Sequence, residues 1–590
     1  MKDGTVEYDT DVLVLGSGLA GLRAAIEAKK ATCDVILVDK SFLARMSNSM
    51  YAGLIGSGAI LEGPPPRHEY SLEHTFEHMA AEGVDPGWDY PYLENEKLMM
   101  VIAVEMVERQ TELRDYGVQI PAGDRYSVGP SSGYRILMPL LQTAIRMGVK
   151  PMATTFLFDL IKKGDRVIGA VGFDVYKGEF VVIRAKSTII ATGGYQKIFK
   201  RTDSTHRMTG DGQAMAYRAG CPLWEMEVWG VDMVGMDEPG LPLWWLSGGG
   251  REFGCYRNGK GEDYMAKYFK ENNLLGPNAT LSLDDPMAKR YDWPGLQSSK
   301  KYPCHQYIVD NLIHFWTAAA KEVYEGRGDR GCVYFDYTKC TEEQMGSNLL
   351  NLLRDFDWKH KWVHIYPFIM ATTGGVDHDE DLRTPVKGLY AAGEAGQGFA
   401  MHHANVTGAR AGRYASMDAL WAAPEPRLGP EDYAWIEDKK KMLQEILDRK
   451  PTPEGDPKEI KRLIGEIVWG YCGPLKTGEG IEKGLKELDK IRKENLPKLY
   501  APNSIRLRDA VEVINMVLVA EAAMRSALAR TETRGTHKRI DYPKRDDKNW
   551  LKNVLVKEEN GKMKVYTRPL PLLWVRPEPG EDVTDPRSMI

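Results

Sequence analysis

Three glycines near the start of the chain have the spacing of a dinucleotide-binding turn. Gly16, Gly18 and Gly21 form the pattern G-x-G-x-x-G between an apolar run and a helical stretch, and the next apolar run ends at an acid, Asp39. The first glycine permits a tight turn, the second lets a pyrophosphate approach the backbone, and the third lets helix and strand pack closely. The helix start offers unpaired N–H groups to phosphate, and the acid can accept hydrogen bonds from ribose hydroxyls. The pattern therefore predicts a dinucleotide site.

Three later segments favour FAD over NAD as the dinucleotide. Residues 189–194 (IIATGG) and 389–395 (LYAAGEA) are apolar runs that end in glycine, and residues 209–212 (TGDG) precede a helical stretch. A long, extended cofactor needs several such close approaches of the backbone, whereas NAD alone does not. No second G-x-G-x-x-G lies between two predicted strands, so the sequence predicts no separate NADH domain. We therefore expect electrons to come from, or go to, a protein partner.

These turns are expected to lie in a doubly wound α/β sheet. Residues 11–15 and 35–38 are apolar runs typical of buried parallel strands, and residues 22–30 between them fit a helix. Further strands are predicted at residues 154–161, 166–173, 179–184, 187–191 and 388–392, and helices at 94–116, 138–147, 213–219 and 405–420. Of the four strands between residues 154 and 191, the first and last are expected to join the main sheet. The middle two are expected to form an antiparallel hairpin layered on it.

A chain of 590 residues is expected to divide into several domains, each with its own core. Residues 1–240 and 365–425 are predicted to form one FAD-binding domain. Between them, residues 241–364 are rich in tryptophan, glycine and lysine, which indicates an inserted capping domain. Residues 426–540 are predicted to form a helical domain, and residues 541–590 a tail that wraps another surface. The predicted fold class is α/β: an FAD-binding Rossmann-like domain with an inserted capping domain and a C-terminal helical domain.

Composition and charge argue against several classes of function. The net charge of −5 does not suggest a nucleic-acid-binding protein, for which a basic stripe is expected. The N-terminus lacks the features of a secretory signal, and no apolar run reaches the roughly 20 residues that span a bilayer. The 7 cysteines form no C-x-x-C pair, so we expect free thiols and no iron–sulfur cluster or other metal site in this chain. A cytoplasmic location is predicted, with membrane association only through a partner.

Taken in this order, the segments resemble the flavoprotein subunits of succinate dehydrogenase, fumarate reductase and adenylylsulfate reductase. The resemblance covers nearly the whole chain. It is carried by residues 18–25 (GLAGLRAA), 211–220 (DGQAMAYRAG), 258–264 (NGKGEDY), 325–328 (EGRG), 333–336 (VYFD), 388–395 (GLYAAGEA), 402–405 (HHAN) and 532–543 (ETRGTHKRIDYP). Residues 546–550 (DDKNW) are most similar to the adenylylsulfate reductase version. The resemblance implies an FAD cofactor, a mobile capping domain and a ferredoxin-like iron–sulfur partner subunit in a hetero-oligomer.

The predicted FAD contacts lie in and beside these segments. They are Gly16, Gly18, Leu19, Ala20, Gly21, Asp39, Lys40, Ser47, Gly53, Leu157, Ala191, Thr192, Gly193, Asp211, Glu394, Asn405 and Ala411. Family members with covalently bound flavin carry a histidine just after the second strand. Residues 44–51 (ARMSNSMY) hold none. The FAD of this chain is therefore expected to be non-covalent.

The resemblance fails at the groups that bind a dicarboxylate. Members that use one carry H-P-T where this chain has residues 232–234 (DMV), a histidine where it has Met370, and an arginine where it has Val406. The arginine that donates a proton from the capping domain has no match, since residues 304–325 contain no arginine. In the family these groups neutralise two carboxylates and deliver a proton. Fumarate and succinate are therefore not expected to be substrates.

The candidates for a catalytic group are His402, His403, Arg410, Asp232 and His305. The two adjacent histidines follow a glycine-rich loop, and His402 occupies the family's histidine position. It could orient substrate, donate a proton, or only hydrogen-bond the flavin or the backbone. Arg410 could hold an anion or lie at the surface, and Asp232 could be a base or a structural acid.

The predicted capping domain offers further candidates. His305, His314 and Lys321 could each donate a proton in place of the missing arginine. An aromatic cluster near the start of this domain could stack on an aromatic or nucleotide-like substrate, or only pack in the core. Its members are Trp229, Trp244, Trp245 and Tyr256.

Three functions remain open from the sequence. The main hypothesis is an FAD-containing subunit of a multi-subunit oxidoreductase that passes electrons between a small anionic substrate and an iron–sulfur partner. A second is a stand-alone flavin reductase or dehydrogenase of an unsaturated or sulfur-containing acid. A third is a non-catalytic FAD electron-transfer or scaffold subunit that has lost its substrate site.

Overall fold

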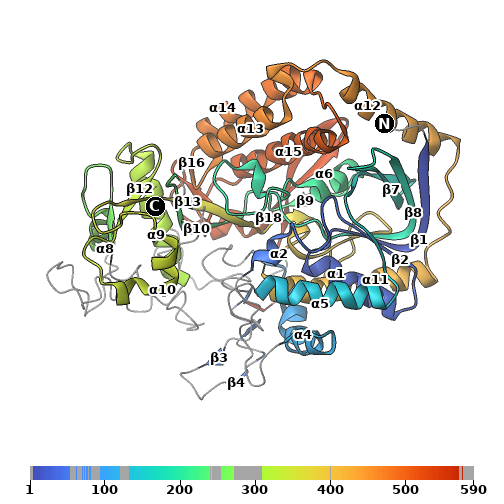
Figure 1. Cartoon of the computed structure of the whole chain (residues 1–590), viewed down its shortest axis with the longest axis horizontal. Coiled ribbons are helices and arrows are strands. Elements are labelled where there is room, and N and C mark those ends of the chain that lie inside the picture. Colours follow the sequence, from blue (N-terminus) through green and yellow to red (C-terminus); the bar gives the residue numbers. More distant parts are fainter. Residues whose placement is uncertain are drawn as a thin grey trace.

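The structure is a computed structural model, and it describes residues 4–52, 61–62, 69–70, 72, 75–76, 79–80, 93–119, 132–239, 241, 254–271, 309–398, 400–570 and 574–575. Figure 1 shows a large sheet with helices on both sides, a smaller unit beside it, and a group of helices packed against the large sheet. The predictions for Gly53, Trp244, Trp245 and His305 lie outside the described residues.

A seven-stranded sheet forms the centre of the larger unit. Its strands are β1 (Thr5–Leu15), β2 (Val35–Val38), β5 (Lys150–Met152), β6 (Thr155–Lys163), β7 (Arg166–Asp174), β8 (Phe180–Ile190) and β15 (Leu389–Ala391). Their order is β5-β2-β1-β8-β7-β6, with β15 paired beside β8. β5, β2, β1 and β8 run parallel, which confirms the doubly wound start predicted from the sequence.

β8 differs from the two strands that were predicted at residues 179–184 and 187–191. It is one strand that pairs with β1 along its length, because β1 places an acid beside each of its two charged residues. Arg184 contacts Asp9 (Nε to Oδ1, 2.6 Å), and Lys186 contacts Asp11 (Nζ to Oδ1, 3.0 Å). On its other edge, the first half of β8 pairs antiparallel with β7 and the second half parallel with β15. The predicted antiparallel pairing of residues 166–173 with residues 179–184 is present between β7 and β8, but the prediction that this hairpin is layered on the main sheet was wrong, since both strands belong to that sheet.

The turn from β1 into helix α1 (Leu19–Lys30) depends on two glycines. Gly16 has a φ of +103°, and a Cβ at this position would lie 2.2 Å from the carbonyl oxygen of Ala191, just beyond β8. A Cβ at Gly21 would lie 1.9 Å from the carbonyl oxygen of Gly16. Only glycine lets β1, β8 and α1 approach one another this closely.

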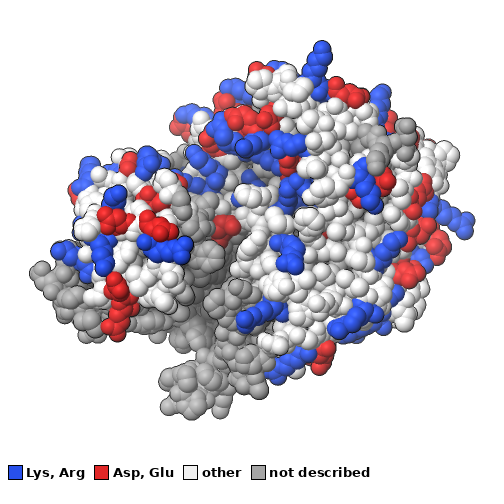
Figure 2. All heavy atoms as spheres, viewed as in Figure 1, with Lys and Arg blue, Asp and Glu red and all other residues white. Residues whose placement is uncertain are grey.

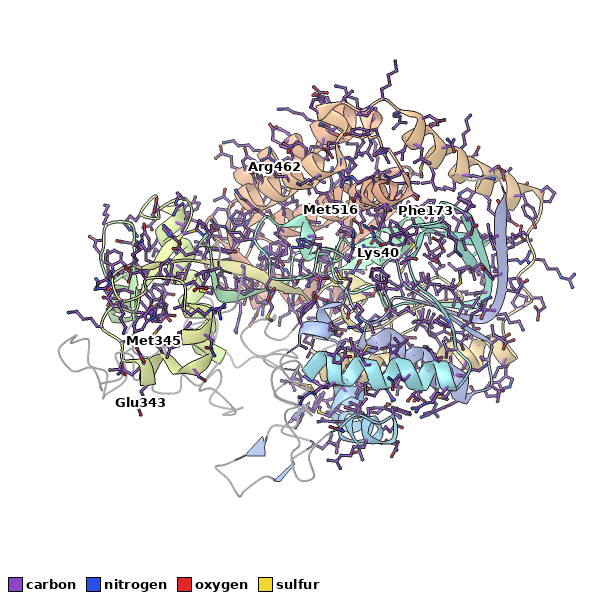
Figure 3. The ribbon with its side chains drawn as sticks, viewed as in Figure 1. Lys40, Phe173, Glu343, Met345, Arg462 and Met516 are labelled. Carbon is purple, nitrogen blue, oxygen red and sulfur yellow. The ribbon has the colours of Figure 1, made fainter. Side chains whose placement is uncertain are left out.

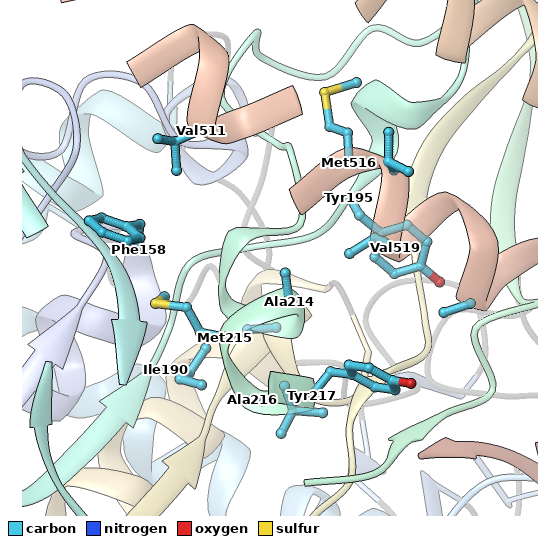
Figure 4. Packing of buried hydrophobic residues seen from close by; sticks show 14 of the residues in the cluster. Phe158, Ile190, Tyr195, Ala214, Met215, Ala216, Tyr217, Val511, Met516 and Val519 are labelled. Atoms are coloured by element: carbon cyan, nitrogen blue, oxygen red, sulfur yellow. The ribbon is translucent and has the colours of Figure 1, made fainter. Parts of the chain in front are cut away.

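Helices cover both faces of the sheet (Figure 1). α1, α5 (Ser132–Arg146) and α11 (Met401–Trp421) lie on one side, and α4 (Glu96–Asp115) packs against α11. On the other side, α6 (Asp211–Arg218) is covered by α15 (Ser504–Ala529). Figure 4 shows this second layer, in which α6 lies between Ile190 of β8 and the α15 residues Met516 and Val519.

The smaller unit, which we call the cap, has its own sheet and core. The sheet runs β10 (Trp229–Met236), β13 (Val363–Thr372), β12 (Val333–Asp336) and β11 (Cys255–Arg257), and the cap's helices are α8 (Tyr264–Glu271), α9 (Val309–Tyr324) and α10 (Glu342–Leu352). β10 ends before residue 241 and β13 crosses residue 364. The sheet thus spans both of the predicted domain boundaries, because its two long strands continue directly from the FAD-binding part of the chain.

The C-terminal part contains helices, as predicted, and then a hairpin. The helices are α12 (Pro430–Asp448), α13 (Pro457–Cys472), α14 (Gly478–Lys490) and α15. The hairpin β18 (Lys552–Glu559) and β19 (Lys562–Pro569) completes a sheet with β9 (Leu223–Trp224) and β14 (Gly375–Val376). Much of the predicted tail is therefore part of a folded sheet, and it also reaches α4, where Val575 N donates to Glu96 Oε1 (3.1 Å).

Charges of both signs are mixed on the face shown in Figure 2. On α13, for example, exposed Arg462 contacts Glu459 and Glu466. Exposed pairs of this kind add little stability, so the helical domain depends on the apolar core around α15. Among the described helices, none combines the length and apolar character needed to cross a bilayer. Cys33, Cys221, Cys332 and Cys472 are free thiols.

Replacing Gly21 with alanine tests the close packing of the β1–α1 turn. The new Cβ would overlap the carbonyl oxygen of Gly16, so we expect Gly21→Ala to lower the free energy of unfolding by about 1–3 kcal/mol or more. Urea denaturation followed by circular dichroism measures this change. Gly470→Ala is the matched control, because it also adds a Cβ in a helix but meets nothing within 4 Å, and it should be neutral or stabilising. Equal stability of the two variants would contradict the packing described here.

Candidate functional site

A cavity of about 510 Å³ opens at the carboxyl ends of β1, β2 and β8. This volume falls within the range of roughly 300–1,000 Å³ that is typical of cofactor sites. The turns after these three strands form much of its wall, together with α2 (Asn48–Tyr51) and the start of α11. Ligands of open α/β sheets bind at this edge, so the cavity is the candidate functional site.

Many of the predicted cofactor contacts lie on the wall of this one cavity. They are Gly16, Gly18, Leu19, Ala20, Asp39, Lys40, Ser47, Leu157, Ala191, Thr192, Gly193, Asp211 and Glu394. Gly21 lies behind the wall, where it packs α1 on β1. Asn405 and Ala411 are buried on α11 and do not line the cavity. The contact of each residue with the cofactor stays a prediction.

The start of α1 faces the cavity without a side-chain cap. Gly18 is its N-cap residue and supplies no capping side chain. Leu19 N donates to Ser49 Oγ (3.3 Å), and no side chain among the described residues caps the N–H groups that follow in the first turn, so these can meet a ligand. A Cβ at Gly18 would meet only ordinary contacts with Ser47 and Ser49, at 3.5 Å. Packing within the protein therefore leaves room for a side chain at residue 18. The absence of one fits a bound phosphate, which would approach the backbone in that space.

Asp39 is held rigidly at the end of β2. Its two carboxylate oxygens accept from the backbone N–H and hydroxyl of Ser17 (3.1 and 2.5 Å) and from those of Ser41 (both 2.8 Å). These four bonds occupy most of the acceptor capacity of a carboxylate. A ribose hydroxyl at Asp39 would thus have to share an oxygen that the protein already uses.

Lys40 is the centre of a buried charge network. Its Nζ lies 2.5 Å from Asp211 Oδ2, 2.8 Å from Glu512 Oε1 and 2.7 Å from Thr209 Oγ1. Burial alone would raise the pKa of Glu512, but the nearby cations, Lys40 foremost, hold it well below its usual value. Figure 3 shows Lys40 in the interior of the larger unit. The network joins the end of β2 to α6 and α15.

Sequence reasoning missed Glu512, although a signal for it exists. Glu512 and Asn515 interrupt an otherwise apolar stretch of α15, and both are buried. Asn515 Nδ2 donates to Asp211 Oδ1 (2.7 Å), and Glu512 contacts Lys40, which is the lysine partner of Asp211. Polar residues in the apolar stretch of a buried helix need such partners.

His402 and His403 differ in what they face. His402 lines the cavity, and its buried Nε2 has no hydrogen-bond partner. Burial lowers the pKa of His402 to about 4, so the imidazole is neutral at pH 7. His403 does not line the cavity, and its ring lies beside Gly398. Burial, and then His402 and His378, hold the pKa of His403 well below its usual value.

Glu394 connects the end of β15 to the cap. Its Oε1 accepts from Thr372 N of β13 (3.0 Å), and its Oε2 accepts from Gly194 N (3.3 Å). Burial raises the pKa of Glu394 to about 7, although these N–H donors oppose the rise. A carboxyl group that is half protonated near neutral pH thus lies on the cavity wall.

Arg410 does not reach the cavity. Its guanidinium donates to Glu105 Oε1 (2.5 Å), Asp381 Oδ1 (2.7 Å) and the carbonyl oxygen of Glu380 (2.8 Å). These partners tie α11 to α4 and to the loop before β15. Since its donors are used in this way, the structure does not support the predicted role of Arg410 in holding a substrate anion.

The predicted aromatic cluster packs in the core where it is described. The ring of Trp229 lies 5.0 Å from that of Phe199, and Lys476 Nζ lies 4.9 Å from the Trp229 ring. The rings of Tyr256 and Phe335 are 4.4 Å apart. Neither Trp229 nor Tyr256 lines the cavity.

The remaining candidates of the cap are placed only in part. Asp232 lies on β10, opposite Phe368 of β13, but its side chain is outside the described residues, as is that of His314. Lys321 lines a second cavity of about 180 Å³ within the cap. It therefore does not meet His402 at the larger cavity.

Two family models match the chain. The model of the FAD binding domain matches residues 11–410, which is more than half of the chain, and that of the fumarate reductase flavoprotein C-terminal domain matches residues 461–583. Among relatives, the 8-methylmenaquinol:fumarate reductase flavoprotein subunit of Wolinella succinogenes is 28% identical over 94% of this chain and 89% of its own. A fumarate reductase (CoM/CoB) subunit from Methanothermobacter marburgensis is 27% identical over 93% of this chain and 97% of its own.

Solved structures share the fold over nearly the whole chain. A structure of Sdh1 from Mycobacterium smegmatis has a TM-score of 0.80 and 23% identity, covering 97% of this chain and 96% of its own. Adenylylsulfate reductase from Archaeoglobus fulgidus has a TM-score of 0.74 and 21% identity, covering 97% of both chains. At these identities the likeness is one of fold.

Replacing Lys40 with methionine tests the buried network. Lys40→Met would leave Asp211 and Glu512 buried with one cation fewer, so we expect the free energy of unfolding to fall by roughly 3 kcal/mol or more. Urea denaturation of the flavin-free protein measures this fall. Lys483→Met on exposed α14 removes a lysine that contacts Glu479 at 2.7 Å and should change little. If both variants unfold at the same urea concentration, Lys40 does not hold the three elements together.

Proposed function

The chain belongs to the FAD-binding family and carries the C-terminal domain of the fumarate reductase flavoproteins, and from this premise we propose that it is the FAD-bearing subunit of a multi-subunit oxidoreductase. In the proposed reaction, electrons pass between a small substrate other than fumarate or succinate and an iron–sulfur partner subunit. The observation that carries the proposal is the cavity at the β1–α1 turn. Its wall holds many of the predicted FAD contacts, and it has Met370 where dicarboxylate members carry a histidine.

The residues of the cavity fit FAD. Ser47 Oγ, Thr192 Oγ1 and His402 Nε2 all lie on the wall, are buried, and have no hydrogen-bond partner among the residues that the structure describes. Buried polar atoms without partners point to a ligand that completes them. We assign the pyrophosphate to the Gly18 turn and the start of α1, and the flavin to the side of His402. FAD bound there would supply chemistry that links two-electron and one-electron transfer.

Two residues that differ from those of dicarboxylate-binding members argue against a dicarboxylate substrate. Met370 lies on the wall where dicarboxylate members carry a histidine. Val406, in place of their arginine, is buried in a cluster with Leu98 and Ile102 of α4. An anionic substrate, the kind favoured by the sequence, would need a cation, and the wall's Lys40 and Arg207 are already held by acids. Such a cation would have to come from residues outside the described ranges.

The proposed partner accounts for the route of electrons. The sequence places no second G-x-G-x-x-G between two predicted strands, as an NADH domain would require, and relatives that match over nearly the whole chain are named as subunits. An iron–sulfur subunit would take up single electrons from the flavin. Any membrane association would come through this partner.

Purification of the native protein tests the proposal. We expect it to co-purify with a second subunit, with iron and with FAD, and the flavin to be reduced through that subunit. A native protein that is found alone and turns over with NADH would contradict the proposal and favour the stand-alone reductase. A native complex in which no small molecule reduces or reoxidises the flavin would favour the non-catalytic subunit, which the loss of the dicarboxylate groups also suits.

Denaturation tests how the flavin is held. The wall beside α2 offers Ser47 and Asn48 but no histidine, so we expect FAD to be non-covalent. After acid precipitation and centrifugation, all flavin absorbance should appear in the supernatant. Flavin that remains in the washed pellet would show a covalent bond. A covalent flavoprotein treated in parallel checks that the precipitation retains bound flavin.

A further inference from the structure

The part of the cavity wall that we group with His402 has three methionines among its six members. We call it the His402 end, and its members are Met46, Asn48, Ser204, Met370, Met401 and His402. Hydrogen bonds hold its segments together: Asn48 Nδ2 donates to Ser204 Oγ (3.1 Å), and Ser204 Oγ donates to the carbonyl oxygen of Met370 (3.0 Å). The loop before α11 joins the same strand, since Gly398 N donates to the carbonyl oxygen of Thr373 (3.1 Å).

No free cation lies at the His402 end among the described wall residues. The cations of that wall are Lys40 and Arg207. Lys40 contacts Asp211 and Glu512, and Arg207 contacts Glu512 at 3.3 Å, so both belong to the network at α6 and α15. Their charges are balanced there and are not available to a substrate at His402.

The His402 end does offer hydrogen-bond donors. His402 Nε2 is buried and unpartnered, and a neutral imidazole nitrogen can donate when it carries the proton. α11 begins at Met401, directly before it, and its N-cap Ala400 supplies no side-chain cap, so no side chain of the N-cap residue satisfies the first N–H groups of the helix. A helix start carries only a partial positive charge, about half an elementary charge. These groups suit an oxygen acceptor better than a pair of carboxylates.

We propose that the substrate presents an uncharged carbonyl group, such as that of a thioester, to His402, and that free carboxylates are disfavoured at this end. This inference rests on the proposed function and names the class of its substrate. A carboxylate placed among Met46, Met370 and Met401 would lose its hydration without gaining a counter-ion. An uncharged carbonyl group loses less hydration free energy, and it gains a hydrogen bond from His402. The flexible, polarisable methionines would accommodate an apolar acyl chain.

A matched pair of ligands tests the inference. The crotonyl thioester of N-acetylcysteamine and crotonate share the same four-carbon unsaturated skeleton, but only crotonate is charged. Each is titrated into the purified native holoprotein with oxidised flavin, and binding is followed by the change in visible flavin absorbance. We expect the Kd of the thioester to be at least about tenfold lower than that of crotonate. Crotonate or fumarate binding as tightly as the thioester overturns the inference, as does the absence of any spectral change with the thioester.

Variants then locate the contact. His402→Leu removes the donor and should weaken thioester binding by up to about tenfold, whereas His402→Gln keeps an N–H group and should remain close to wild type. Met370→Lys adds a cation and should strengthen crotonate binding several-fold. Arg413→Leu is the control, since Arg413 is exposed on the same helix and should leave both affinities unchanged. An unchanged thioester Kd in His402→Leu with full flavin content also overturns the inference.

The two proposals fail separately. The titration uses only the flavin of the holoprotein as a reporter and needs neither turnover nor an iron–sulfur partner. A protein that purifies without iron but prefers the thioester would overturn the proposed complex and leave the substrate class standing. A native iron-containing complex that prefers crotonate would do the reverse.

Discussion

The buried contact between Lys40 and two acids is the interaction on which the arrangement of this molecule depends. Lys40 follows β2, Asp211 begins α6 and Glu512 lies in the middle of α15, so one ammonium group joins parts of the chain that are far apart in sequence. None of the three side chains could be buried alone without a large desolvation cost. Their mutual pairing fixes α15 over α6 and leaves one side of the cavity wall rigid and balanced in charge.

The His402 end of the wall differs from the part that contains Lys40. At the His402 end the wall holds three methionines, and the buried Nε2 of His402 has no hydrogen-bond partner among the described residues. The described cations of the wall, Lys40 and Arg207, are instead paired with acids at α6 and α15. Val406, on the same helix as His402, does not line the cavity but is buried in a cluster with Leu98 and Ile102 of α4.

Elements predicted from local sequence patterns agree with the structure, whereas contacts between residues far apart in the chain could be found only in the structure. β1, α1 and β2 follow from glycine spacing and short apolar runs, which depend on neighbouring residues. The unity of β8 could not be predicted, because Arg184 and Lys186 look like a break until Asp9 and Asp11 of β1 are placed beside them. In the site, residue type identified the glycine turns and His402. It did not reveal that Arg410 is used by Glu105 and Asp381, or that His403 does not line the cavity.

The pairing of β8 with β15 has a consequence for how the protein is made. The cavity wall combines residues 16–20, 191–193 and 392–404, and the whole cap is translated between the second and third of these. At synthesis rates of about 5–20 residues per second, the glycine turn leaves the ribosome roughly twenty to eighty seconds before α11 can close the site. FAD is therefore enclosed late, by a chain that is already more than two-thirds complete. Until then, the exposed edge of β8 must be kept from pairing with other strands.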